Sequence, residues 1–236
     1  MPANCPEDHT DSRFGKRPGR FYDLLRVISR SVFDMTMRWR ITGLEYVPES
    51  GGFLVAACHL NHLDPVVVST VLPHRIGWIS RVEFCRHWLM RRFLYHSGAF
   101  PVNRQGYARP ALREGLKRLA AGEVVGVFPE GEIMSGSASV LRGGPLRHGI
   151  CWLAAHSGRP VLPVVILGTD RLSRVSPWLP ALRGQLWFTA GPPLTAPPAA
   201  RTRAGRAAFA ARLEEEFRRL ARETRERHRL PDSIIP

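Results

Sequence analysis

Apolar residues recur at intervals of three and four positions between residues 21 and 40, and charged residues fill the positions between them. This spacing places the apolar side chains on one face of a helix and the charged side chains on the other. We therefore predict an amphipathic helix over residues 21–40. Its expected apolar face comprises Phe21, Leu25, Ile28, Val32, Met35 and Trp39, and its charged face Asp23, Arg26, Arg30, Asp34 and Arg38.

Short apolar runs alternate with helical patterns along the rest of the chain. Each run is too short for a buried helix and ends at glycine, proline or polar residues, which is typical of a buried strand. The alternation predicts an α/β fold, a single domain whose mixed, mostly parallel sheet is flanked by helices. The expected strands cover residues 39–43, 53–58, 75–80, part of 98–104, 124–128, 161–167 and 185–190, and the further helices begin at Asp64 or cover 84–95, 109–121, 149–156 and 201–229.

Composition divides the chain into three parts. Residues 1–20 are polar and should form a disordered tail, residues 21–200 the domain, and residues 201–236 a charged helix and tail. A length of 236 residues suits one domain with a full hydrophobic core. Residues 1–20 lack the apolar segment of a secretory signal, and no apolar stretch is long enough to span a membrane. We therefore expect neither a signal peptide nor a transmembrane helix.

Positive charge dominates the composition, because 34 lysines and arginines against 20 aspartates and glutamates give a net charge of +14. Such a surplus suits an anionic membrane surface, a phosphorylated small molecule or nucleic acid as the partner. The arginines are dispersed, and no nucleic-acid-binding signature is present. We therefore expect no nucleic acid partner, and a basic nucleic-acid-binding protein is kept as the alternative from another functional class.

The four cysteines show neither the spacing of a zinc site nor an evident disulfide framework. We expect reduced thiols, as in a cytosolic protein. The cysteines are Cys5, Cys58, Cys85 and Cys151.

The segment from Phe53 to Asp64 ends an apolar run with a histidine, and an aspartate follows after four intervening residues. We predict that His59 lies on the turn between a strand and a helix, with Asp64 as the N-cap and Pro65 as the first helical residue. This turn can bring the aspartate back onto the imidazole. A histidine held in this way by a carboxylate has the arrangement of a general base.

Other interpretations of these residues stay open at this point. Asp64 alone is more often a helix cap, and His59 alone is more often a histidine satisfied by backbone groups. A metal site of His59, His62 and Asp64 lacks a further cluster of ligands. Cys58 as a nucleophile would close a buried strand and face away from His59, and buried cysteines are usually inert.

A serine hydrolase is a further alternative. The candidate nucleophiles lie in a Gly/Ser-rich loop, and the G-x-S-x-G turn of such enzymes is absent from the sequence. The serines concerned are Ser135, Ser137 and Ser139.

Four blocks of the chain resemble the motifs of the glycerolipid acyltransferases, whose best-known members are the 1-acylglycerol-3-phosphate acyltransferases. The blocks are His59–Asp64, with Cys58 where that family usually has asparagine, then Gly98–Arg104, Phe128–Gly131 and the proline-containing strand Val161–Val165. They occur in the family's order and spacing between residues 21 and 191. On these blocks the chain is identified as a member of that family.

The resemblance implies roles for individual residues. His59 would be the general base that takes the proton of the acceptor hydroxyl, and Asp64 would orient it. Gly98 and Arg104 would form the phosphate site, since a guanidinium binds phosphate oxygens in a bidentate manner. The other substrate-binding residues would be Glu130, Gly131 and Arg147.

The third block departs from the family at two positions. Glu132 and Ile133 stand where the family has threonine and arginine. The arginine would supply a second cation for the acceptor phosphate. Either Arg142 or Arg147 supplies that charge here, or the acceptor has another head group.

The resemblance implies an O-acyltransferase that moves a fatty acyl group from acyl-CoA or acyl-carrier protein to the hydroxyl of a lysophospholipid. The expected acceptor is 1-acylglycerol 3-phosphate, which would give phosphatidate, and the alternative is a lyso-lipid without a terminal phosphate. No metal and no cofactor besides the acyl donor is expected. Helices 21–40 and 84–95 pair bulky apolar groups with arginines, which suits peripheral binding to the anionic, cytoplasmic face of a membrane.

Overall fold

The computed structural model describes residues 19–83, 87–102, 109–169 and 184–235. These residues form an α/β domain around a seven-stranded sheet of order β1-β7-β6-β2-β5-β3-β4. Neighbouring strands are parallel except β6 and β7, which run antiparallel. The predicted α/β domain with a mixed, mostly parallel sheet is therefore confirmed. The strands are β1 (Met37–Thr42), β2 (Leu54–Ala57), β3 (Ile76–Arg81), β4 (Phe100–Val102), β5 (Val124–Val127), β6 (Val161–Leu167) and β7 (Gly184–Ala190).

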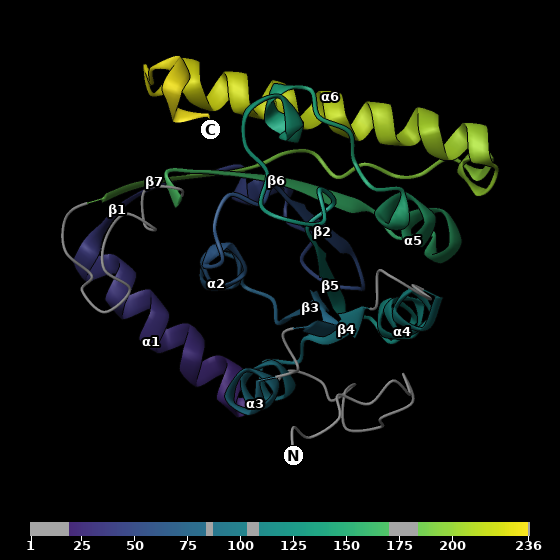
Figure 1. The fold of residues 1–236 in the computed structure, drawn as a ribbon, viewed down its shortest axis with the longest axis horizontal. Coiled ribbons are helices and arrows are strands. Elements are labelled where there is room, and N and C mark those ends of the chain that lie inside the picture. Colours follow the sequence, from purple (N-terminus) through teal and green to yellow (C-terminus); the bar gives the residue numbers. More distant parts are fainter. Residues whose placement is uncertain (1–18, 84–86, 103–108, 170–183, 236) are drawn as a thin grey trace.

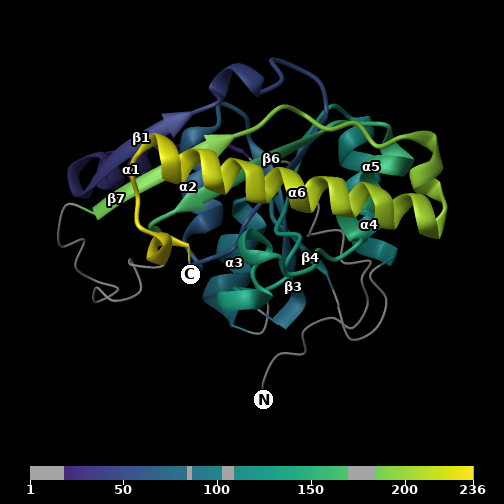
Figure 2. The ribbon, with the colours of Figure 1, turned by 90° about the horizontal axis from the view of Figure 1, so that it is seen from above.

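Helices cover both faces of this sheet. Figure 1 shows α6 along one side of the sheet, with α1, α2 and α3 on the opposite side, and Figure 2 shows α6 crossing over the strands from above. One face of α6 is buried against β6 and β7 through apolar side chains such as Leu213 and Phe217. The charged helix therefore belongs to the core of the domain. The helices are α1 (Arg20–Thr36), α2 (Asp64–Val71), α3 (Trp88–His96), α4 (Arg109–Ala120), α5 (Gly149–Ser157) and α6 (Arg203–Arg227).

The first helix ends earlier than the sequence pattern predicts. Residues 37–42 pair in register with residues 184–189 of β7, so the strand predicted at 39–43 begins two residues earlier and Trp39 belongs to it. Its apolar spacing fits a helix and a strand equally well, and the ladder of hydrogen bonds to β7 decides between them. The predicted tail falls almost entirely on residues 1–18, which lie outside the described residues.

Polar and aromatic side chains attach helix α1 to the domain. The hydroxyl of Tyr22 accepts a hydrogen bond from the backbone N–H of Ile76 at 3.1 Å, and Asp23 forms an ion pair with Arg75. Phe33 is buried, while Met35 is 86% exposed. Much of the apolar face that the sequence predicts is therefore not covered by the protein. No helix in the described parts of the chain combines the length and apolarity that crossing a bilayer requires.

Strand β2 carries the candidate site to the centre of the sheet. Its residues are buried, and it lies between β5 and β6. In open parallel sheets, ligands bind beyond the carboxyl ends of such strands. The chain leaves β2 through residues 58–63 and enters α2 at Asp64. Asp64 is itself the first helical residue, and its side chain does not cap the helix, so the N-cap prediction was wrong by one position.

Candidate active site

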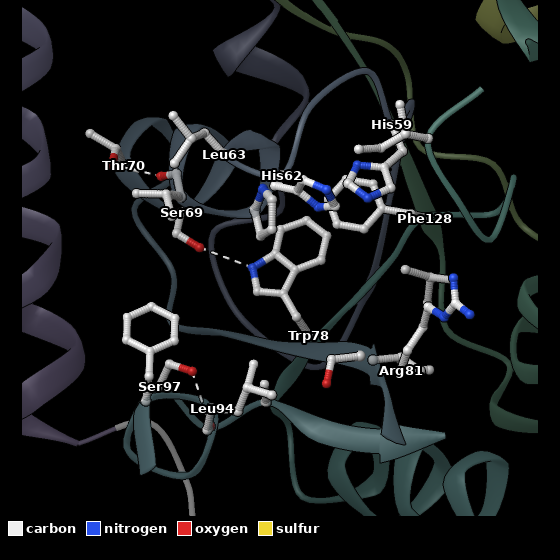
Figure 3. A pocket seen from close by; sticks show the side chains of 18 of the residues that line it. His59, His62, Leu63, Ser69, Thr70, Trp78, Arg81, Leu94, Ser97 and Phe128 are labelled. Carbon is white, nitrogen blue, oxygen red and sulfur yellow. Dashed lines mark hydrogen bonds between the residues drawn. The ribbon is translucent and has the colours of Figure 1, made fainter. Parts of the chain in front are cut away.

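A cavity of about 1500 Å³, lined mostly by apolar residues, lies between the sheet and the helices α1, α2 and α3. Figure 3 shows His59, His62, Trp78 and Phe128 on its wall. Val32 and other apolar side chains of α1 and α3 also line it, together with residues of α4 and α5. A cavity of this size and composition has room for a hydrocarbon chain next to a histidine.

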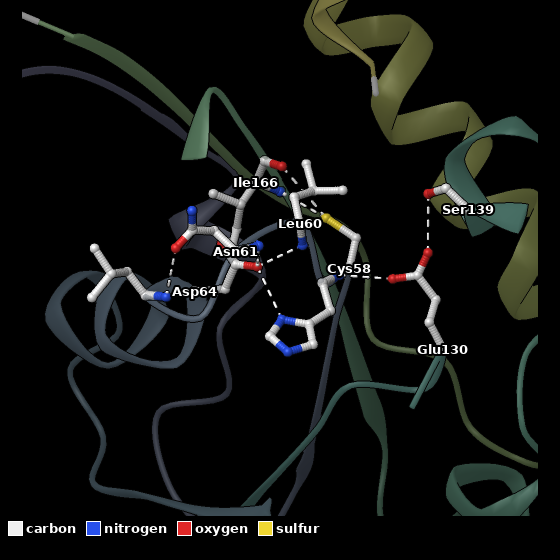
Figure 4. A network of polar contacts seen from close by, with 9 residues as sticks. Cys58, Leu60, Asn61, Asp64, Glu130, Ser139 and Ile166 are labelled. Atoms are coloured by element: carbon white, nitrogen blue, oxygen red, sulfur yellow. Dashed lines mark hydrogen bonds and ion pairs between the residues drawn. The ribbon is translucent and has the colours of Figure 1, made fainter. Parts of the chain in front are cut away.

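His59 and Asp64 meet on the turn between β2 and α2. Nδ1 of His59 lies 3.1 Å from Oδ2 of Asp64. The same oxygen accepts hydrogen bonds from the backbone N–H groups of Leu60 and Asn61, at 2.6 and 2.7 Å (Figure 4). The prediction that this turn brings the two side chains together is therefore confirmed. Because the carboxylate binds the backbone of the turn, the turn itself fixes its place beside the imidazole.

Burial differs sharply across this pair. The Asp64 side chain is fully buried, whereas the His59 side chain is 14% exposed and lines the cavity. A carboxylate is an acceptor only, so a neutral imidazole beside it carries its proton on Nδ1 and keeps a lone pair on Nε2. Within the described residues, Nε2 of His59 has no hydrogen-bond partner. The arrangement can accept a proton from a molecule in the cavity.

Aromatic rings fix the plane of the imidazole. Phe128 stacks on His59 with a centroid distance of 4.1 Å, and Trp78 stacks on Phe128 at 4.6 Å. Nε1 of Trp78 donates a hydrogen bond to the hydroxyl of Ser69 at 3.0 Å. Sequence reasoning did not identify Trp78, because a tryptophan in a strand is usually only a core residue. The stack restricts rotation of His59 and forms one wall of the cavity.

Glu130 lies behind His59 rather than on the cavity wall. Its carboxylate accepts hydrogen bonds from the backbone N–H of His59 at 2.7 Å, the hydroxyl of Ser139 at 3.0 Å and the backbone N–H of Val140 at 2.8 Å. Burial raises the pKa of Glu130, and these hydrogen bonds act in the opposite direction. The residue was expected to bind substrate. Its position is that of a buried support for the backbone of His59 (Figure 4).

Gly131 and Arg147 both line the cavity next to this support. Gly131 has a φ of 88°, and a Cβ atom at this position would lie 2.4 Å from Nε of Arg147. The same Nε donates a hydrogen bond to the backbone carbonyl of Glu130 at 3.1 Å. Glycine is therefore needed both for the backbone conformation and for the passage of the arginine side chain.

Arg147, but not Arg142, brings positive charge to the cavity where Ile133 replaces the family's arginine. Ile133 and Glu132 line the cavity, and Glu132 lies 3.5 Å from Arg147. Arg147 thus brings a cation to the rim of the cavity, and the Glu132 carboxylate that pairs with it lies there as well. Arg142 does not line the cavity, because its guanidinium binds Asp232 on the far side of the loop. The alternative that Arg142 supplies the phosphate-binding charge was wrong.

The second block is described only in part. Gly98 ends α3 with a φ of 75°, and its carbonyl accepts a hydrogen bond from Arg118 at 2.7 Å. Its neighbours Ser97 and Ala99 line the cavity, and Gly98 itself acts as a helix stop. Arg104 lies outside the described residues, so its proximity to His59 stays a prediction.

The geometry also bears on the alternative nucleophiles and the metal site. The Cys58 thiol is buried and donates to the carbonyl of Ile166 at 3.5 Å, and burial raises its pKa well above the ordinary range. Such a thiol is a poor nucleophile. Ser139 uses its hydroxyl to bind Glu130. Among the residues that the structure describes, no three His, Cys, Asp or Glu side chains are grouped to hold a metal ion.

Comparisons with known proteins connect this geometry to other chains. The Acyltransferase family model matches residues 38–167, more than half of the chain. The 1-acyl-sn-glycerol-3-phosphate acyltransferase of Bacillus subtilis (strain 168) is 27% identical over 130 residues, which are 55% of this chain and 62% of that protein. The match therefore spans less than two thirds of the relative's length.

A solved structure shares the fold. The crystal structure of the 1-acyl-sn-glycerophosphate (LPA) acyltransferase PlsC from Thermotoga maritima has a TM-score of 0.66 and 20% sequence identity, covering 86% of this chain and 78% of the other. The matched family region contains His59, Asp64 and Phe128–Gly131. The chain belongs to the acyltransferase family.

Proposed function

We propose that this acyltransferase moves a fatty acyl group from a thioester, acyl-CoA or acyl-carrier protein, to the free hydroxyl of a lysophospholipid. The proposed acceptor is 1-acylglycerol 3-phosphate, and phosphatidate is the product. The observation that carries the proposal is the contact of 3.1 Å between His59 and Asp64 on the wall of an apolar cavity. No cofactor besides the acyl donor takes part.

In the proposed mechanism His59 acts as the general base and Asp64 keeps it in place. Nε2 of His59 takes the proton of the acceptor hydroxyl while the hydroxyl oxygen bonds to the thioester carbonyl carbon. The carbon–sulfur bond then breaks, and the leaving thiolate takes the proton back from the imidazolium. The Asp64 carboxylate stabilises the imidazolium between these two steps. Every covalent step occurs between the two substrates, so no protein nucleophile is needed.

Arginine side chains at the site and the name of a relative support 1-acylglycerol 3-phosphate as the acceptor. Arg147 lines the cavity, and Arg104 is the proposed phosphate ligand in the second block. The Bacillus subtilis relative is named for 1-acyl-sn-glycerol 3-phosphate. A second acceptor is favoured by one observation, because Glu132 lies 3.5 Å from Arg147 and offsets its charge. A lyso-lipid without a terminal phosphate is therefore the alternative acceptor.

A panel of acceptors distinguishes the two. Thioester consumption by the wild-type protein is measured with 1-acylglycerol 3-phosphate and with lyso-lipids that carry no terminal phosphate. With the phosphate acceptor, the Arg104→Ala variant is expected to raise KM by about 10- to 100-fold, the range of a hydrogen bond to a charged group. Arg113→Ala, at an exposed position on α4, is the matched control. An unchanged KM in Arg104→Ala, or a clear preference for the neutral head group, contradicts the proposed acceptor.

We further propose that the protein binds peripherally to the anionic, cytoplasmic face of a membrane through α1 and α3. Apolar side chains on both helices are exposed, among them Val27 and Trp88, each 64% exposed. The rings of Phe21 and His96 lie 5.3 Å apart, which brings the two helices together beside the cavity. Lipid could then enter the cavity directly from the headgroup layer.

Vesicle binding tests this surface. The double variant Val27→Ser and Trp88→Ser is expected to bind vesicles of anionic phospholipid at least about 10-fold more weakly, because two large apolar side chains no longer enter the membrane. Leu44→Ser, at a position 44% exposed on η1 (Leu44–Tyr46), is the control. Retention on DNA without retention on anionic vesicles would support the nucleic-acid-binding alternative and contradict the membrane proposal.

A further inference from the structure

The segment that follows α6 is held by a single arginine of the loop between β5 and α5. Arg142 donates hydrogen bonds to the backbone carbonyls of Asp232 at 3.1 Å and Ile235 at 2.8 Å. The Asp232 carboxylate also binds Arg225 of α6. Ile234 and Ile235 are buried in the core beneath these contacts. The segment 232–235, which we call the C-terminal clasp, is therefore fixed to both the loop and α6.

The same loop supports the candidate base. Ser139 and Val140, which stand directly before Leu141 and Arg142, donate hydrogen bonds to one carboxylate oxygen of Glu130. The other oxygen of Glu130 accepts the backbone N–H of His59. An unbroken series of contacts thus runs from the clasp through the loop and Glu130 to the backbone of His59.

The loop is also held by backbone hydrogen bonds of its own, such as that from the N–H of Gly144 to the carbonyl of Ser139 at 2.8 Å, and by buried side chains such as Val140. It contains two short 3-10 turns, η3 (Gly136–Ala138) and η4 (Val140–Arg142), and its backbone forms no part of the sheet. Contacts with α6 hold it from outside, including a hydrogen bond from the backbone N–H of Leu146 to Glu214 at 2.9 Å. The guanidinium of Arg142 adds the hydrogen bonds that join this loop to the clasp.

We propose that Arg142 and the C-terminal clasp position the catalytic base, with Arg142 acting through the loop and Glu130 on the backbone of His59. Arg142 is a positioning residue and does not contact substrate. The expected effect on activity rests on the proposed function of His59. The expected effect on the conformation of the His59 backbone is independent of that function.

The test combines kinetics with amide hydrogen exchange in the 236-residue chain. In Arg142→Ala, kcat for acyl transfer should fall by about 10-fold or more, because small displacements of a catalytic group lower the rate steeply, while KM for both substrates stays unchanged. The amides of Val140 and His59 should exchange at least about 10-fold faster than in the wild-type protein. Arg142→Lys should restore part of both effects, since the ammonium can still donate to a carbonyl.

Arg219→Ala is the matched control, because the hydrogen bonds and ion pairs of Arg219 go to Glu216 and Glu223 on α6. It should lower the midpoint of thermal unfolding about as much as Arg142→Ala and leave kcat unchanged. An unchanged kcat in folded Arg142→Ala overturns the proposal, and so does a raised KM with unchanged kcat, which would make Arg142 a substrate ligand. If the wild-type protein shows no acyl transfer, hydrogen exchange alone tests the proposal. Exchange of the Val140 and His59 amides that is unchanged in Arg142→Ala then overturns the positioning role of Arg142.

Discussion

Replacing His59 by alanine is expected to lower kcat for acyl transfer by about 10²- to 10⁴-fold, the range that general base catalysis contributes. The acceptor hydroxyl then loses the base that the Asp64 carboxylate orients. The fold should persist, since the imidazole is held by one side-chain hydrogen bond and one ring stack. Thioester consumption with a lysophospholipid acceptor measures the effect.

The matched control for this variant is His156→Ala. His156 is an exposed histidine on α5 whose Nδ1 lies 2.8 Å from the carbonyl of Trp152, and it does not line the cavity. Its loss should leave kcat unchanged. Added imidazole should restore part of the activity of His59→Ala, because the substitution leaves a gap against Phe128 that imidazole can fill. It should have no such effect on His156→Ala. Wild-type activity in His59→Ala would remove the assignment of the base.

The contact between His59 and Asp64 could be predicted from the sequence because it is local. Four residues separate the two, and the flanking pattern predicts a strand-to-helix turn. The end of the first helix could not be predicted in the same way, because Trp39 fits the apolar face of that helix and also opens the predicted strand 39–43. The apolar neighbours of Trp39 recur at a spacing that suits a helix, and only pairing with the distant strand β7 makes the segment extended.

The contacts that support the His59 backbone could not be predicted from the sequence either, because they join residues far apart in the chain. The hydrogen bond from the His59 backbone to Glu130 joins residues 71 positions apart, and that between Arg142 and Ile235 spans 93 positions. A Pro-Glu-Gly sequence predicts a turn, but it does not show which way the carboxylate points. The motif thus indicated that Glu130 matters near the site, and the structure places it as a buried support for the backbone.

The Asp64→Asn substitution removes the negative charge of Asp64 but keeps the shape of its side chain. Oδ2 accepts three hydrogen bonds, from Leu60, Asn61 and His59, whereas the buried Oδ1 has no partner among the described residues. The amide oxygen of asparagine must therefore replace Oδ2, since an NH₂ group there would face two backbone N–H donors. The amide nitrogen then replaces Oδ1 and breaks no contact. The turn and the imidazole tautomer are retained, and only the negative charge is lost.

Asp64→Asn is therefore expected to fold, with an unfolding free energy lower by about 1–3 kcal/mol because hydrogen bonds to a charged acceptor become neutral ones. Its kcat should fall by about 10²- to 10³-fold, the scale on which one preorganised electrostatic group stabilises a transition state. Asp64→Ala should be the less stable variant, because it leaves two buried backbone N–H groups without an acceptor. Denaturant unfolding and kcat measured on both variants separate these effects. If Asp64→Asn keeps wild-type kcat, the carboxylate only shapes the turn, and its proposed part in catalysis is wrong.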